Sequence, residues 1–84
     1  STPSELQICV ETDLALLERA MVAAYKTTLS TLPAEQKPAF RRAHLEWFKA
    51  YARTCNAPMD SISRRECIAR ELSQRRLAME ATRR

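Results

Sequence analysis

The chain has 84 residues, a formal net charge of +4 at pH 7 and an apolar fraction of 45%. A chain of this size can bury only one small core, worth about 3 to 5 kcal/mol net, so a single domain is expected. It contains no glycine, which argues against hairpins, phosphate loops and dinucleotide folds. No apolar run reaches the roughly 20 residues of a transmembrane helix. The start at Ser1 predicts that an upstream segment was removed.

The first predicted helix covers residues 3–32. Thr2 and Glu5 form a capping box, with Pro3 at the first helical position. Apolar positions then recur in steps of three or four, which keeps one face of the helix inward. These positions are Leu6, Val10, Leu14, Leu17, Met21, Ala24, Thr28 and Leu32.

A second helix is predicted over residues 34–55, beginning at either Pro33 or Pro38. Its inner face is expected to carry Phe40, His44, Trp47, Tyr51 and Cys55, with Leu45, Phe48 and Ala52 widening the apolar stripe. Asn56 is a candidate for the left-handed cap that glycine would normally supply.

A third helix is predicted over residues 61–82, with Asp60 as its N-cap. Its inner stripe is Ile62, Ile68 or Ala69, Leu72 and Met79. Because short connections make neighbouring helices antiparallel, the expected fold is all-α, an antiparallel three-helix bundle with a long first helix.

Three cysteines, Cys9, Cys55 and Cys67, are expected to meet at one end of this bundle. Cys55–Cys67 and Cys9–Cys67 are rival disulfides, and three reduced thiols remain a third alternative. The spacing of the cysteines matches no metal site, and no metal or other cofactor is expected. His44 is eleven residues from Cys55 on the same helix, about 16 Å away, which excludes a catalytic pair. With no carboxylate pair or phosphate loop either, no enzymatic activity is expected.

Charge is unevenly distributed along the chain. Residues 1–36 carry two basic and five acidic side chains, whereas residues 37–84 carry twelve basic and five acidic side chains. The bundle is expected to gather basic residues at the end opposite the cysteines, beside Glu35 and Glu80: Lys26, Lys37, Arg41, Arg42, Arg75, Arg76, Arg83 and Arg84. This basic pole would bind an anionic partner or would simply complement the helix dipoles and keep the protein in solution.

Several segments resemble the LprI-type lysozyme-inhibitor domain family of small secreted helical domains. They are Cys9-Val10, LERAMVAAY, STLPAEQKPAF, AHLEWFKAYARTC, REC and LSQRR. Family positions, from residue 9 to about 79, are occupied by Cys9, Glu18, Met21, Tyr25, Trp47, Cys55, Cys67, Leu72 and Arg75 or Arg76. The chain departs at Val22, His44 and Tyr51, where the family has asparagine, glutamine and arginine, and it lacks a cysteine upstream of Cys9.

The resemblance implies a periplasmic or secreted, non-enzymatic domain that occludes a partner protein such as a muramidase, and an oxidising compartment that favours the disulfide. Many lysozymes are basic, so contact would need an apolar patch or the acidic first helix, where Glu11 and Glu18 lie. Arg41, Arg42, Arg75 and Arg76 are the other candidate contacts.

Two alternatives remain beside the inhibitor. The first is a structural subunit of an envelope complex or the immunity protein of a cell-wall-degrading toxin. The second is a nucleic-acid binder acting through the basic pole. The second lacks an evident stacking platform, because Trp47 and Tyr51 are expected in the core.

Overall fold

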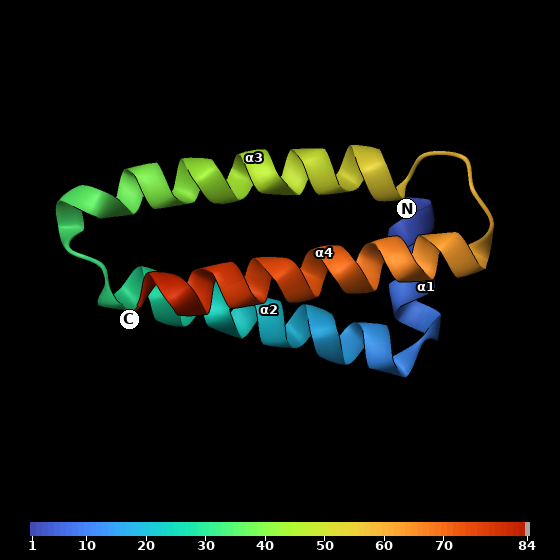
Figure 1. Cartoon of the computed structure of the whole chain (residues 1–84), viewed down its shortest axis with the longest axis horizontal. Helices are drawn as coiled ribbons and strands as arrows, with labels where there is room; N and C mark the ends of the chain where they lie inside the picture. Colours follow the sequence, from blue (N-terminus) through green and yellow to red (C-terminus); the bar gives the residue numbers. More distant parts are fainter. Residues whose placement is uncertain (84) are drawn as a thin grey trace.

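The structure, a computed structural model, describes residues 1–83, so Arg84 of the predicted basic pole lies outside it. It is all-α, as expected, but the described chain has four α-helices in place of three (Figure 1). In chain order these are α1 (Pro3–Val10), α2 (Thr12–Thr31), α3 (Lys37–Cys55) and α4 (Ser61–Thr82). A short 3-10 turn, η1 (Ala34–Gln36), precedes α3, whose first turn holds Pro38.

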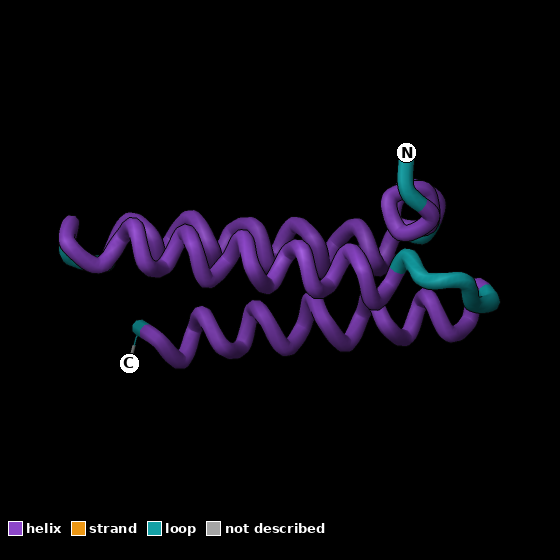
Figure 2. The backbone as a smooth tube through the Cα atoms, turned by 90° about the horizontal axis from the view of Figure 1, so that it is seen from above, coloured by secondary structure: helices purple, strands orange, loops and turns teal. Residues whose placement is uncertain are grey.

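The prediction of one long first helix is wrong because the chain turns at Glu11, whose backbone is extended at φ −112° and ψ 107°. A straight helix over residues 3–32 would be about 45 Å long and would exceed the 41 Å length of the whole molecule. The turn lays α1 across the end of the other helices, so that Figure 2 looks along α1 while the others lie in the plane. Leu6 and Val10 are therefore 57% and 79% exposed, and the buried residues of α1 are Ser4 and Ile8.

Helices α2 and α4 pack side by side and antiparallel, and they supply most of the buried core. The inner residues predicted for this pair are confirmed for Leu14, Met21, Ala24, Thr28, Ile68, Leu72 and Met79. The buried hydroxyl of Thr28 donates to the Met79 carbonyl at 3.4 Å, which satisfies a polar group inside the core. Ile62 was predicted inside but is 70% exposed, because it lies in the first turn of α4.

Helix α3 presents a narrower face to this pair than predicted. Tyr51 and Cys55 are buried, and Phe40 and Trp47 pack partly buried against the core. Leu45 and Phe48 do not widen the buried face, since they are 51% and 50% exposed.

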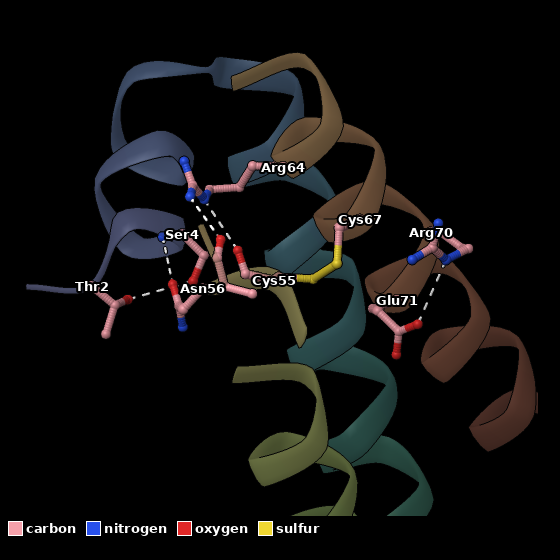
Figure 3. The surroundings of a disulfide bond; sticks show 9 residues. Thr2, Ser4, Cys55, Asn56, Arg64, Cys67, Arg70 and Glu71 are labelled. Carbon is pink, nitrogen blue, oxygen red and sulfur yellow. Dashed lines mark hydrogen bonds and ion pairs between the residues drawn. A yellow bond between two sulfur atoms is a disulfide. The ribbon is translucent and has the colours of Figure 1, made fainter. Parts of the chain in front are cut away.

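The predicted caps of α3 and α4 have different outcomes. Asp60 caps α4 as expected, its Oδ1 accepting from the Ser63 N–H at 2.7 Å. Asn56 ends α3 with φ −98°, and no residue from 1 to 83 has a positive φ, so the left-handed cap is wrong. The Asn56 side chain instead serves α1, with Oδ1 accepting from the Ser4 N–H at 2.8 Å (Figure 3).

A disulfide joins Cys55 to Cys67, with their Cα atoms 5.6 Å apart, which confirms the first of the two rival pairings (Figure 3). Cys9 is a free, exposed thiol. Arg64 also stabilises this corner. Its Nε donates to the Cys55 carbonyl and its Nη2 to the Ala57 carbonyl, both at 3.1 Å. These bonds satisfy the carbonyl group of the last residue of α3 and one carbonyl group of the connection that follows it. Within residues 1–83, no helix has the length and apolarity to cross a membrane.

Candidate protein-interaction surface

Four aromatic rings form a continuous stack between α2 and α3. Tyr25 of α2 lies on His44 with ring centroids 4.1 Å apart, His44 on Trp47 at 5.3 Å, and Trp47 on Tyr51 at 5.1 Å. Phe40 extends the array from the other side of Tyr25 at 5.4 Å. The spacing of His44, Trp47 and Tyr51 places all three on one face of α3. The side chains of the stack therefore lie between α3 and the pair of α2 and α4, whose ribbons are separate from that of α3 in Figure 1.

Arg75 of α4 enters this aromatic array. Its guanidinium carbon lies 5.8 Å from the ring centroids of both Phe40 and Trp47, and its Nε donates to His44 Nδ1 at 3.1 Å. Burial, together with the charge of Arg75, lowers the pKa of His44 to about 4. Burial also lowers the pKa of Arg75. Arg75 thus contacts the interior of the protein and is not an open surface cation.

The other residues of the predicted basic pole differ in their availability. The Lys37 ammonium donates to the Leu29 carbonyl, and Arg83 forms an ion pair with Glu80 at 3.9 Å. Arg76 is half-buried, and its Nε has no hydrogen-bond partner within residues 1–83. Lys26, Arg41 and Arg42 are exposed and form no ion pair within the described residues. The aromatic rings of the stack are partly buried against the core and already stack on one another, so the pole does not offer their faces to nucleic-acid bases.

The acidic residues near α1 fall into two groups. Arg65 of α4 forms ion pairs with Glu11, at 2.6 Å, and with Asp13. Hydrogen bonding to Arg65 lowers the pKa of Asp13. Glu5 and Glu18 are exposed, and within residues 1–83 neither forms an ion pair. Of the two acidic residues predicted as contacts, Glu11 is therefore engaged by Arg65 at the turn, and Glu18 is accessible.

A small cavity of about 130 Å³ lies where α1, α2 and α3 meet, and we call it the corner cavity. It is lined by Thr2, Ser4, Glu5, Ile8, Glu18, Phe48, Tyr51, Ala52 and Asn56. Both accessible glutamates belong to this lining, together with the exposed ring of Phe48. Sequence reasoning missed the cavity because α1 was expected to continue along the axis of α2.

Large apolar side chains remain exposed on the surface of the described chain. They are Leu6, Val10, Leu16, Val22, Leu45, Phe48, Ile62 and Leu77. Scattered exposed apolar residues are normal, and Leu6, Val10, Val22 and Phe48 each border a shallow or concave site with charged residues. The corner cavity differs from the other sites in that its charged residues, Glu5 and Glu18, are both acidic and form no ion pair within residues 1–83. The surface around it is therefore the candidate contact for a basic partner. No group of three or more His, Cys, Asp or Glu side chains that could hold a metal ion occurs in residues 1–83.

Comparison with known protein families assigns this chain to a family. The family model described as lysozyme inhibitor LprI matches residues 1–79. The chain belongs to this family. The match confirms the resemblance seen in the sequence and extends it to the start of the chain, and it makes the chain a relative of protein inhibitors. No curated protein and no solved structure matches the chain.

The LprI-type positions named from sequence now have structural roles. Cys55 and Cys67 form the disulfide, while Tyr25 and Trp47 belong to the aromatic stack. Two of the three positions at which this member departs, His44 and Tyr51, stack on either side of Trp47. Aromatic packing thus occupies these sites, and the third, Val22, is exposed on α2.

Proposed function

We propose that this LprI-family protein is a periplasmic or secreted inhibitor that binds a lysozyme-type muramidase and occludes its substrate cleft. The family match over residues 1–79 carries the proposal. The Cys55–Cys67 disulfide supports an oxidising compartment, where such bonds persist. Inhibition by occlusion requires no reactive group on the inhibitor, only a rigid surface that fits the partner.

The proposed contact is the face that holds the corner cavity. Exposed Phe48 supplies apolar area, and aromatic residues are enriched at the energetic centres of interfaces. Glu5 and Glu18 supply uncompensated negative charge, which complements a basic muramidase even though the chain as a whole carries +4. The acidic face would thus contact the enzyme while the basic pole points away.

Inhibition of cell-wall lysis tests this function directly. The oxidised protein is titrated into a panel of muramidases acting on suspended cell walls, and the fall in turbidity is followed. We expect inhibition of at least one enzyme that saturates at one inhibitor per enzyme. The same protein reduced and alkylated serves as a control, since loss of the disulfide should weaken inhibition. Full lytic activity across the panel at an excess of folded protein would contradict the proposal.

A structural or immunity role predicts a different result in the same system. Such a protein would leave the general panel active and be recovered in a stable complex from an envelope extract. The nucleic-acid alternative is disfavoured by the position of Arg75 within the aromatic stack. If nucleic acid did bind, its affinity would fall steeply with salt.

A further inference from the structure

The corner cavity has a floor and a wall of apolar or aromatic groups. Ile8 of α1 and Tyr51 of α3 are buried in its floor, and Phe48 forms a wall that is half open to solvent. Its volume of about 130 Å³ is well below the roughly 300 Å³ at which pockets for small organic ligands begin. The space therefore suits a single side chain better than a saccharide or a peptide segment.

Two carboxylates stand at this cavity, and the turn at Glu11 brings them together. Glu5 comes from the first turn of α1 and Glu18 from the middle of α2, thirteen residues later. In a continuous helix these residues would be about 20 Å apart along the axis. Here both line one small site with Phe48 and Tyr51.

The hydroxyl of Tyr51, in the floor of the cavity, is affected by both carboxylates. Burial, and next the charge of Glu18, raises the pKa of Tyr51 to about 12, with Glu5 adding in the same direction and a hydrogen bond with Ser4 opposing it. Tyr51 therefore stays neutral and adds no negative charge of its own. The remaining polar lining, Thr2, Ser4 and Asn56, is also uncharged.

The local hydrogen bonds hold this arrangement in place without neutralising it. The Ser4 N–H is bound by Asn56 Oδ1 at 2.8 Å, and Thr2 Oγ1 accepts from the Glu5 N–H at 3.2 Å. Arg65, the basic residue that secures the turn, is engaged by Glu11 and Asp13. The site is thus pre-organised, and its two glutamates form no ion pair within the described chain.

We propose that the corner cavity receives one lysine or arginine side chain of the partner protein, with its alkyl stem against Ile8 and Phe48 and its cationic group between Glu5 and Glu18. Long basic side chains combine an apolar stem with a charged end, which matches the apolar floor and the acidic rim. Paired carboxylates form strong charge-assisted hydrogen bonds with such a group, and the Phe48 ring adds a cation-π contact. An apolar side chain would desolvate the carboxylates without compensation, and an acidic one would be repelled. This inference rests on the proposed inhibitor function, for which it specifies the contact.

The first test compares two double variants that remove the same charge. Glu5→Gln with Glu18→Gln changes the cavity, while Glu35→Gln with Glu66→Gln changes two exposed glutamates that line no part of it. Affinity for the inhibited muramidase is measured by calorimetry. We expect the cavity variant to bind at least about tenfold more weakly, because two charge-assisted contacts are lost, and the control to stay within about twofold. Equal affinities of the two variants would overturn the inference and leave the inhibitor function standing.

The second test needs no muramidase, so it separates failure of the cavity from failure of the proposed function. Acetyl-arginine methylamide and acetyl-lysine methylamide are titrated into the labelled protein, and backbone amide shifts are followed by NMR. We expect saturable shifts at Glu18, Phe48 and Ala52 with both probes and none with the neutral acetyl-citrulline methylamide. The shifts should vanish in the cavity variant, whose circular dichroism shows that it remains folded. Equal shifts with citrulline, or none with the cationic probes, would overturn the inference.

Discussion

His44 shows how one side chain can depend on a single protonation state. Its ring is stacked between Tyr25 and Trp47, and its Nδ1 accepts a hydrogen bond from Arg75. Only a neutral imidazole has a free lone pair at Nδ1. Protonation would convert this acceptor to a donor and place two cations in contact inside the aromatic array. The native structure is therefore compatible with neutral His44 alone.

This dependence predicts that stability falls as the pH is lowered from 6.5 to about 4. The pKa of His44 is about 4 in the folded chain, against 6.5 as the reference for an unfolded one. In that window the unfolded chain binds the proton and the folded chain does not, so the free energy of unfolding decreases with falling pH. Because the side chain is partly exposed, solvent screening reduces the loss to about 1 to 2 kcal/mol.

Urea unfolding followed by Trp47 fluorescence at several pH values measures this slope. His44→Gln is the matched control, since glutamine does not titrate but retains an acceptor for Arg75, and its slope over the same window should be much smaller. Asp13 and Asp60 have pKa values lowered from 3.8, so their contributions are lost mainly below pH 4, and the part lost within the window is common to the parent and the variant. An equal slope in the parent and the variant would show that His44 is not the responsible group.

At the scale of the element, α1 is the shortest of the four α-helices of the described chain and is held by its docking to the others. An isolated helix of eight residues is unstable in water, so α1 depends on its docking. That docking consists of buried Ile8, the bond from the Ser4 N–H to Asn56, and the bond from Gln7 Nε2 to the Ser61 carbonyl at 2.7 Å. Ser4 is itself buried, so its amide has no easy substitute for Asn56 in solvent.

Replacement Asn56→Ala should therefore loosen α1 and leave the other helices in place. The unpaired Ser4 amide costs about 1 to 2 kcal/mol. Hydrogen exchange should show faster exchange across residues 3–10 and unchanged protection in the cores of α2 and α4. Asn56→Asp, which keeps an oxygen acceptor at the same place, should preserve most of the protection. Slow exchange of α1 in the alanine variant would mean that Ile8 and the Gln7–Ser61 bond suffice to hold the helix.

The inner faces of α2 and α4 could be predicted from sequence because they depend on local spacing and caps. Steps of three and four locate Leu14, Met21 and Leu72, and Asp60 marks the start of α4. The turn at Glu11 could not be predicted from sequence, because no proline or glycine marks it. The residues whose contacts hold it are distant in the sequence. Asn56 and Arg65 lie more than forty residues further along the chain.

The corner cavity could not be predicted from the sequence for the same reason, because it exists only after α1 folds across the bundle. Periodicity also cannot set the width of a buried face. Tyr51 and Phe48 have the same apolar character, but α3 contacts its neighbours through one narrow face, and Phe48 stays half exposed. One usable signal was length, since the 30 residues of the first predicted helix exceed the 22 residues of each predicted partner helix that would have to cover it.

At the scale of the whole molecule, α2 and α4 form the close pair. The attachments of α3 to this pair include the aromatic stack, the connections over residues 32–36 and 56–60, and the Cys55–Cys67 disulfide. The disulfide lies at the corner where α1 also docks through Asn56, the residue next to Cys55. Its loss should therefore affect both α3 and the corner cavity.

Removing the disulfide should lower the free energy of unfolding by about 3 kcal/mol, from the loop entropy of cysteines twelve residues apart. For a domain of this size that loss corresponds to a fall in Tm of about 12 to 24 °C. Cys55→Ser with Cys67→Ser is compared with Cys9→Ser, which removes the free exposed thiol and should melt like the parent. Alkylation of the native protein should label one thiol, and three after reduction in denaturant. Parent-like melting of the double variant would show that packing of the aromatic stack suffices to hold α3.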